Sequence, residues 1–357
     1  MGKKVLINLN SDNIFSCENY LDIASNIGAE IFTIGFSVEK RPIIALKKGT
    51  GKIKVLFVSR IHGNEPATTQ AMLEFFNNYN SKDITIFGIL LANPDGASLF
   101  EQLWLQNREP HWKNSFNNAR LNAAGVDLNR DWFDLSQEET RAIRRFIFSI
   151  RPDFVIDHHE FYWSDKGYPP KQPIEDEDGF MATMTDAPFY GVHQFVKEIS
   201  KKAMYTLIEK LENDFQWKIK VRHFAGKSDN NIEIPTVLGI YLALRGIPKL
   251  LVETWGVGCS TLLLEQRIKF HYLSMKYITN WIRSEESSFL NKPESLQLLR
   301  YNLKDADSRK IDLFLRKLGL HQIKFKKEKD SVIVNIPTTE VGFIDTIHNS
   351  IFERKRM

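Results

Sequence analysis

The chain has 357 residues, 43% of them hydrophobic and 26% charged, which is ordinary for a globular protein that buries a substantial core. Its net charge is only +4. The tail from residue 296 to the end contains 13 Lys and Arg and 8 Asp and Glu, so the tail carries a charge of +5. The rest of the chain is therefore close to neutral, which argues against nucleic acid as a partner of the main body.

The chain begins with two lysines and a short apolar stretch within Met1–Asn10. This stretch is shorter than the apolar core of about 7–15 residues in a secretory signal. No apolar run reaches the roughly 20 residues of a transmembrane helix. Cys17 and Cys259 are the only cysteines, too few for a disulfide scaffold. We therefore expect a cytoplasmic protein that does not enter a membrane.

Strand-like and helix-like segments alternate from residue 52 onward. Short apolar runs rich in β-branched residues predict strands, and apolar residues at helical spacing predict helices. In chain order the expected elements are strand 53–59, helix 67–79, strand 84–91, helix 138–150, strand 153–157, helix 192–211, helix 236–245, strand 249–252 and helix 264–283. This order predicts an α/β fold, a doubly wound and mostly parallel sheet with helices on both faces. In such sheets ligands bind at the carboxyl ends of the strands.

Two long connections contain many aromatic residues, and long loops in compact domains are usually functional. The first is expected over 98–133, after a turn at 93–96 that ends strand 84–91. The second is expected over 161–190.

The tail forms a separate unit in this interpretation. Charged and serine residues before Pro293 predict a linker, followed by a helix through 311–318 that ends at Gly319. A hairpin is expected from strands 322–326 and 332–336. We therefore expect a main domain over 1–285, and a linker with a small α+β appendage over 286–357.

Candidate metal ligands follow two of the predicted strands. His62 and Glu65 lie three residues apart directly after strand 53–59, and Pro66 suits the start of the next helix. One imidazole and one carboxylate are a typical partial zinc set. His158 and His159 stand at the end of another strand, where alternate side chains point to opposite faces. Only one of them can therefore face the first two residues.

Two further groups have the chemistry of an amide hydrolase. Glu253 follows the apolar end of strand 249–252, where a carboxylate suits the role of a general base. Asn129 and Arg130 stand beside a tight turn, and an arginine there can bind a substrate carboxylate through two parallel hydrogen bonds.

The sequence resembles the zinc carboxypeptidase family, in its compact bacterial-type members. The similarity follows the family's order over roughly residues 18–285. It is carried by the segments Ile34–Ile43, His62-Gly63-Asn64-Glu65-Pro66, Asn93-Pro94-Asp95-Gly96, Gly125-Val126-Asp127-Leu128-Asn129-Arg130 and Glu253-Thr254. One departure concerns the tyrosine that closes over substrate in larger members. Only Tyr241 stands nearby, in a segment that is expected to be helical, so that role is not assigned.

The resemblance implies a catalytic domain over 1–285 with one zinc ion per chain. It implies His62, Glu65 and His159 as the zinc ligands, with His159 preferred over His158 by the family's Asp-x-His pattern. Residue by residue, it further implies that Asp127 orients the first zinc histidine, Arg120 polarises the scissile carbonyl, Asn129 and Arg130 bind the terminal carboxylate, and Glu253 is the catalytic base.

The expected function is zinc-dependent hydrolysis of an amide bond beside a free carboxylate. A metallocarboxypeptidase acting on peptides, including cell-wall peptides, is the first hypothesis. An aspartoacylase-like deacylase of N-acyl amino acids is the alternative within the same chemistry. A non-catalytic peptide-binding protein is the alternative of another class, and the presence of Glu253, Arg120 and the complete ligand set argues against it.

Overall fold

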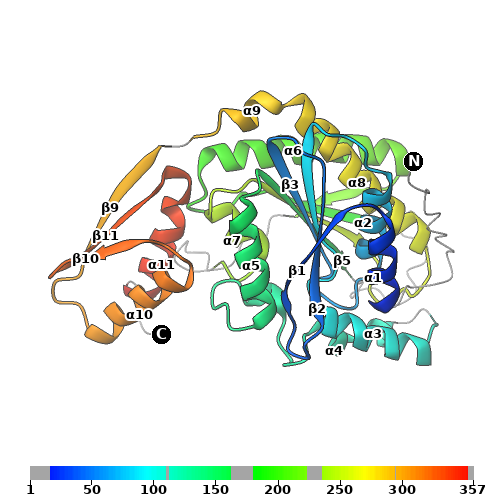
Figure 1. Ribbon diagram of the computed structural model, residues 1–357, viewed down its shortest axis with the longest axis horizontal. Helices are drawn as coiled ribbons and strands as arrows, with labels where there is room; N and C mark the ends of the chain where they lie inside the picture. Colours follow the sequence, from blue (N-terminus) through cyan, green and yellow to red (C-terminus); the bar gives the residue numbers. More distant parts are fainter. Residues whose placement is uncertain (1–16, 110–111, 162–179, 223–234, 294, 353–357) are drawn as a thin grey trace.

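The computed structural model describes residues 17–109, 112–161, 180–222, 235–293 and 295–352 (Figure 1). Its centre is an eight-stranded sheet in the order β1-β2-β4-β3-β5-β8-β6-β7. The strands are β1 (Glu30–Phe36), β2 (Pro42–Lys48), β3 (Ile53–Ser59), β4 (Ile84–Ile89), β5 (Phe154–Phe161), β6 (Ala182–Thr185), β7 (Ile219–Val221) and β8 (Lys249–Trp255). The four central strands β4, β3, β5 and β8 are parallel, as predicted.

Helices cover both faces of this sheet. They are α1 (Cys17–Asn26), α2 (Ala67–Asn78), α3 (Pro94–Gln106), α4 (Asn117–Arg120), α5 (Glu138–Ile150), α6 (Gln194–Phe215), α7 (Leu238–Leu244), α8 (Leu264–Ser284) and α9 (Glu286–Leu290). In Figure 1, α1, α2 and α8 lie on one side of the sheet and α5 and α7 on the other. None of the helices in the described part of the chain is long and apolar enough to cross a membrane.

The sequence of β3 shows why both faces are covered. Val55 and Phe57 pack into the cluster on the α2 and α8 side, and the intervening Leu56 and Val58 pack into the cluster on the α5 and α7 side. All four side chains are fully buried. A continuous apolar run is typical of a parallel strand that is buried on both faces, and the predicted fold class is confirmed.

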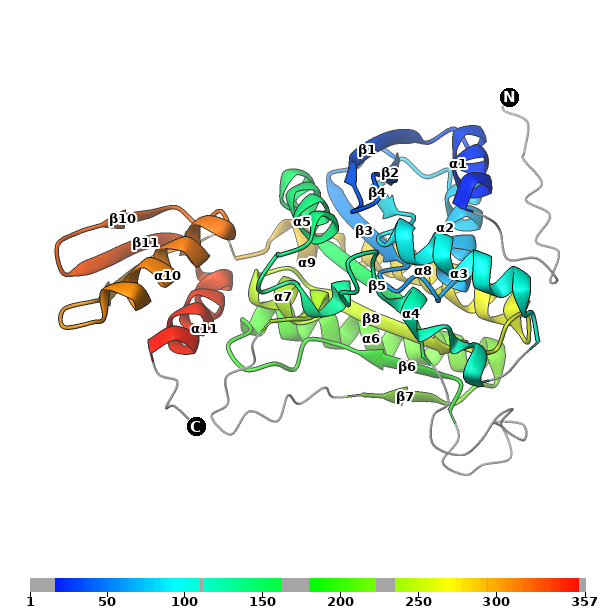
Figure 2. The same cartoon turned by 90° about the horizontal axis from the view of Figure 1, so that it is seen from below.

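The tail forms a second, three-stranded sheet in the order β10-β11-β9. Its elements are β9 (Leu296–Asn302), α10 (Ser308–Leu320), β10 (Phe325–Lys327), β11 (Ser331–Pro337) and α11 (Val341–Phe352). Figure 2 shows this unit at one end of the molecule, beyond α5 and α7. The predicted hairpin is present, but α10 continues through Gly319, and β9 and α11 were not foreseen. The expected linker also contains a helix, α9.

The expected turn at 93–96 is wrong, because these residues begin helix α3. The Asn93 side chain accepts a hydrogen bond from the Gly96 N–H (2.9 Å), and Pro94 stands at the first position of the helix. Asparagine and proline are favoured at these two positions because one accepts a free N–H and the other lacks one. Within the expected loop at 98–133, α3 extends to Gln106 and α4 spans Asn117–Arg120, so the stretch is a loop only in part.

The second expected loop, 161–190, is only partly described. Residues 162–179 lie outside the described residues. Within the rest, Ala182–Thr185 forms β6, which pairs antiparallel with β8. Four residues without a clear alternation give little signal for a strand.

Candidate active site

The loop after β3 carries the first two candidate ligands and is packed tightly. A Cβ on Gly63 would lie 2.0 Å from the Gly96 carbonyl carbon and 2.5 Å from the Ala119 oxygen, so only glycine fits. This close approach holds the loop against the start of α3 and against α4. His62 and Glu65 are 3% and 1% exposed, and the loop thus presents two buried polar side chains beside the end of β3.

His159 of β5 completes a cluster with these two residues. Its Nδ1 lies 2.9 Å from Glu65 Oε2 and 3.1 Å from His62 Nδ1. His62 Nδ1 lies 2.6 Å from Glu65 Oε1. All three side chains are buried, and one ligand atom from each lies within 4.8 Å of the others. Two imidazoles and one carboxylate around one point are a donor set that zinc prefers.

The other ring nitrogen of each histidine faces a carboxylate. His62 Nε2 lies 3.2 Å from Asp127 Oδ1, and His159 Nε2 lies 3.1 Å from Asp157 Oδ2. A proton on His62 Nε2, hydrogen-bonded to Asp127, leaves the His62 Nδ1 lone pair directed at the common point. The Asp157 carboxylate beside His159 Nε2 favours the same tautomer of His159. Carboxylates orient metal-binding histidines in this way. The residues present therefore fit a zinc ion.

Charges within the cluster oppose the effect of burial. Burial alone would raise the pKa of Glu65, but the imidazoles of His62 and His159 bring that pKa well below its usual range. Burial would lower the pKa of His159, but the carboxylates of Asp157 and Glu65 raise it well above its usual value. A proton therefore competes with a metal ion for the His159 nitrogen.

His158 faces the other side of β5. Its Nδ1 lies 3.0 Å from His271 Nδ1 on α8. Burial and the neighbouring His271 hold the pKa of His158 well below its usual value. This imidazole belongs to the helix–sheet packing on the face opposite to His62 and Glu65.

Glu253 of β8 lies next to His159 across the sheet. The two residues are register partners in the parallel β5–β8 pair, so their side chains project from the same face. Thr183 of β6, the register partner of Glu253 on its other side, donates a hydrogen bond to Glu253 Oε2 (2.9 Å). The carboxylate therefore has a fixed position beside the cluster.

Arg120 reaches the cluster from the end of α4. Its Nη1 lies 3.1 Å from His62 Nδ1 and 3.7 Å from Glu65 Oε1. Its Nε and Nη2 lie 3.1 and 3.0 Å from Asp127 Oδ2. Asp127 thus holds both the first histidine and the guanidinium.

Asn129 and Arg130 have different surroundings. Asn129 is buried, its Oδ1 accepts a hydrogen bond from the Leu238 N–H (2.9 Å), and its Nδ2 lies 3.3 Å from His159 Nε2. Arg130 is exposed, and its Nη1 donates to the Asn129 carbonyl oxygen (2.8 Å). Their proposed role as a carboxylate clamp stays a prediction. Tyr241 is fully buried in α7, and its hydroxyl lies 3.3 Å from His321 Nδ1 of the appendage. It is therefore not placed to close over a substrate.

Glu160 of β5 connects this strand to α2 and α8. Its Oε2 accepts the Ala67 N–H at the start of α2 (2.9 Å), and its Oε1 accepts from Arg267 Nη1 of α8 (2.6 Å). Arg267 also donates to the Gly256 and Ser260 carbonyl oxygens after β8 (3.2 and 2.5 Å). The ion pair is completely buried and connects α8 to β5 and to the segments that follow β3 and β8.

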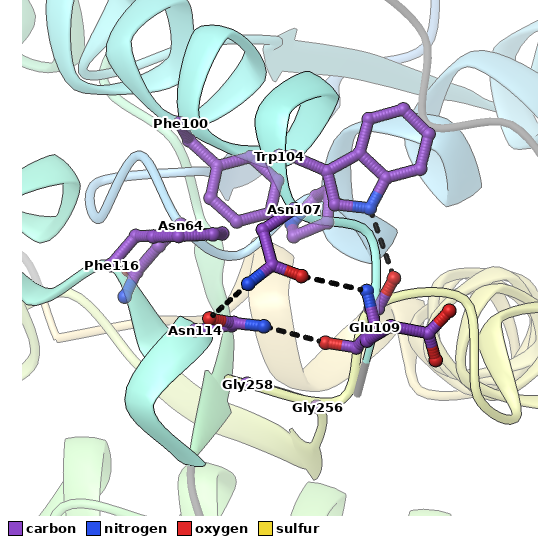
Figure 3. Close-up of a pocket in the computed structure, with 11 residues that line it drawn as sticks. Asn64, Phe100, Trp104, Asn107, Glu109, Asn114, Phe116, Gly256 and Gly258 are labelled. Atoms are coloured by element: carbon purple, nitrogen blue, oxygen red, sulfur yellow. Dashed lines mark hydrogen bonds between the residues drawn. The ribbon is translucent and has the colours of Figure 1, made fainter. Parts of the chain in front are cut away.

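Figure 3 shows a cavity beside the ligand loop, lined by Asn64, by Phe100 and Trp104 of α3, and by Gly256 and Gly258 after β8. Trp104 Nε1 donates to Ser260 Oγ across it (3.0 Å). Its volume of about 10 Å³ suits a single water molecule. This cavity therefore does not serve as a substrate pocket.

Sequence reasoning missed Thr183 and Arg222 near the site, and it used Asp157 only as part of the Asp-x-His pattern, without a role of its own. Asp157 stands two residues before His159, and this spacing on a strand could have placed both on one face. Thr183 had no such signal, because its strand was not predicted. Arg222 follows the three-residue β7, which was also not predicted.

Part of the chain is similar in sequence to known carboxypeptidases. Residues 21–162 match the sequence model of the family described as zinc carboxypeptidase. Carboxypeptidase 2 of Trichophyton tonsurans is 26% identical over 165 residues, which cover 44% of this chain and 27% of that protein. Carboxypeptidase E of Caenorhabditis elegans is 33% identical over 125 residues, 29% of this chain and 25% of that protein. The chain thus spans about a quarter of the length of these relatives.

Solved structures share the fold. A metallo-carboxypeptidase from Burkholderia cenocepacia has a TM-score of 0.55 at 17% identity, covering 76% of this chain and 70% of that one. Bovine thrombin-activatable fibrinolysis inhibitor has a TM-score of 0.55 at 15% identity, covering 77% of this chain and 99% of that one. At such identities the likeness concerns the fold alone.

The matched segment contains all seven candidate residues between His62 and His159, and Glu253 lies beyond it. The predicted zinc cofactor agrees with the family match and with the buried cluster. Residues 21–162 are thus similar in sequence to the zinc carboxypeptidase family, and the His62–Glu65–His159 cluster has the donor set that such a zinc site needs.

Proposed function

We propose that this chain is a zinc-dependent carboxypeptidase that hydrolyses the last peptide bond beside a free carboxylate. The observation that carries the proposal is the buried convergence of His62, Glu65 and His159 with Glu253 as the register neighbour of His159. Three ligands and an adjacent carboxylate are the minimum set for metal-assisted hydrolysis.

A zinc ion held by the three ligands would supply a Lewis acid and a water molecule of lowered pKa. Glu253 would take the proton of the attacking water and pass it to the leaving nitrogen. Thr183 would hold the Glu253 carboxylate in place through its hydrogen bond. Asp127 and Asp157 would keep the two histidines in the tautomer whose Nδ1 accepts the metal.

Arg120 and Arg130 would bind the substrate. The Arg120 guanidinium points at the cluster, where it would donate to the scissile carbonyl oxygen as negative charge develops there. The exposed Arg130 would bind the terminal carboxylate. Asn129, which contacts His159 and the Leu238 backbone, would support that clamp by fixing the segment that carries it.

The test of the base is Glu253→Gln, which keeps the shape of the side chain but removes the proton acceptor. We expect the rate on an N-acylated dipeptide to fall by about 10²–10⁴-fold, with zinc content unchanged. Glu138→Gln, at an exposed position at the start of α5, is the matched control and should keep its rate. Near-normal turnover by Glu253→Gln would remove this residue from the mechanism.

The substrate class is tested by masking the terminal carboxylate. Amidation removes hydrogen bonds to a charged group, each worth about 1.5–3 kcal/mol, so the rate should fall by one to two orders of magnitude. Comparable rates on free and amidated peptides would exclude the clamp. Cleavage of acetyl- or succinyl-amino acids alone would instead indicate a deacylase, and binding of peptides without turnover would indicate a non-catalytic protein.

A further inference from the structure

Arg222 lies on the face of the sheet that carries the site. His159, Glu253, Thr183 and Lys220 are register partners in one row across β5, β8, β6 and β7. Register partners project from the same face, and Arg222 follows Lys220 by two residues, so it starts on that face as well. Its Nη1 lies 3.9 Å from Glu253 Oε2.

The backbone of Arg222 is fixed at the end of β7. Its N–H donates to the Met184 oxygen (2.9 Å), and its carbonyl oxygen accepts from Thr185 Oγ1 (2.8 Å). The guanidinium carbon lies 5.2 Å from the ring centroid of Phe161 and 5.3 Å from that of Phe180. Aromatic contacts of this kind hold an arginine in a defined orientation.

The 3.9 Å approach to Glu253 is too long for a hydrogen bond. The Arg222 side chain is 35% exposed, and within the described ranges its guanidinium has no hydrogen-bonded acceptor. The Arg222 guanidinium is a partly exposed planar cation beside two rings, and its ion pair with Glu253 is too long for a hydrogen bond. Its N–H groups can therefore bind a planar anion through two parallel hydrogen bonds.

We propose that Arg222, held between Phe161 and Phe180, recognises a second carboxylate on the substrate, carried by one of the two residues that flank the cut bond. Arg222 lies close to Glu253, and the proposed base acts at the scissile bond. The second carboxylate must therefore be carried by a residue next to that bond. The inference rests on the proposed carboxypeptidase function and makes acidic peptides the preferred substrate class.

The test uses N-acylated tripeptides in matched pairs. One pair has Glu or Gln as the last residue, and the other has Glu or Gln as the residue before it. We expect the wild-type protein to show a kcat/KM about tenfold higher for Glu than for Gln at one of these positions, as for one charge-assisted contact. The Glu-to-Gln ratio is the readout because any effect of a variant on Glu253 is common to both peptides and cancels.

Arg222→Met should bring this ratio close to one, and Arg222→Lys should keep part of it because the charge remains without the planar fork. Lys220→Met is the matched control. It removes the same charge two residues earlier in the chain, where the Lys220 ammonium lies over Phe180 (5.0 Å), and should retain the wild-type ratio. Zinc content and circular dichroism confirm that each variant is folded.

A wild-type ratio near one at both positions, or a ratio that survives in Arg222→Met, would overturn the inference while leaving the carboxypeptidase proposal intact. If Arg222→Met lowers kcat/KM equally on both peptides of a pair, Arg222 acts only through Glu253. If Lys220→Met also loses the Glu-to-Gln ratio, the preference comes from the general positive charge of this surface and not from Arg222. If the wild-type protein cleaves none of the four peptides, the proposed function fails, and this inference fails with it.

Discussion

At the scale of single residues, the face on which a side chain lies decides its role. His158 and His159 are both buried and differ by one position, yet one lies beside Glu65 and the other beside His271. The sequence could show that only one of them can join His62, because strands alternate. It could not show which, since that depends on the pairing of β5 with β3 and β8. The family resemblance selected His159, and the geometry agrees.

Substitution of each histidine tests this distinction. His159→Ala should lose its zinc, because it leaves only two protein ligands. His158→Ala should retain roughly one zinc per chain despite some loss of stability from a buried truncation. Metal content measured after dialysis, with circular dichroism as the control for folding, separates the two outcomes. Zinc lost by a folded His158→Ala and kept by His159→Ala would reverse the ligand choice.

At the scale of elements, the sequence predicted several long periodic elements and missed the shortest strands, but it also missed the longer α3 and α11. Strand 53–59 and helix 138–150 agree with β3 and α5 to the residue, because their apolar patterns are unbroken. The three- and four-residue strands β7 and β6 are defined by partners distant in sequence, so local pattern could not reveal them. Thr183 lies on β6 and Arg222 directly follows β7, so sequence reasoning could not place either residue at the site.

The packing of elements behind the site depends on Gly256. A Cβ at this position would lie 1.9 Å from Glu160 Oε1 and 2.6 Å from Arg267 Nη1. Neither group can move aside easily, since the ion pair is completely buried and also holds the start of α2. The element junction thus requires glycine for space, not for a special backbone angle.

Gly256→Ala should therefore lower the free energy of unfolding by about 1–3 kcal/mol through overpacking. Gly319→Ala is the matched control, because a Cβ there meets nothing within 4 Å and the residue lies within helix α10. It should be neutral or stabilising by about 0.5–1 kcal/mol. Urea unfolding of both variants measures the difference. Equal stabilities would show that the ion pair tolerates the extra methyl group.

At the scale of the whole molecule, the appendage shares its core with the main domain. Leu128, Trp132 and Tyr241 belong to the same buried cluster as Leu318 and Phe343 of the tail. The sequence predicted the tail as an α+β unit from its own hairpin and helix. It could not show this shared burial, because the contacts join residues about 80 to 200 positions apart. The division at residue 285 stays a prediction, and the shared cluster argues that the two parts unfold together.

His321 at this junction gives the last prediction, on pH. Its Nε2 lies 3.2 Å from the Phe133 carbonyl oxygen and its Nδ1 lies 3.3 Å from the Tyr241 hydroxyl. Burial, with the charges of Arg245 and Lys317, lowers its pKa from 6.5 to about 3. Below pH 6.5 the His321 imidazole is protonated in the unfolded chain but stays neutral in the folded chain. The free energy of unfolding therefore falls as the pH decreases from about 6.5 towards 3. At pH 5 this one group should lower the free energy of unfolding by about 2 kcal/mol.

His321→Gln keeps a donor for Phe133 but does not titrate, so its melting temperature should fall less than that of the wild type between about pH 7.5 and pH 5. Calorimetry at both pH values measures the two losses, and equal losses would mean that other groups, not His321, set the acid sensitivity of the fold.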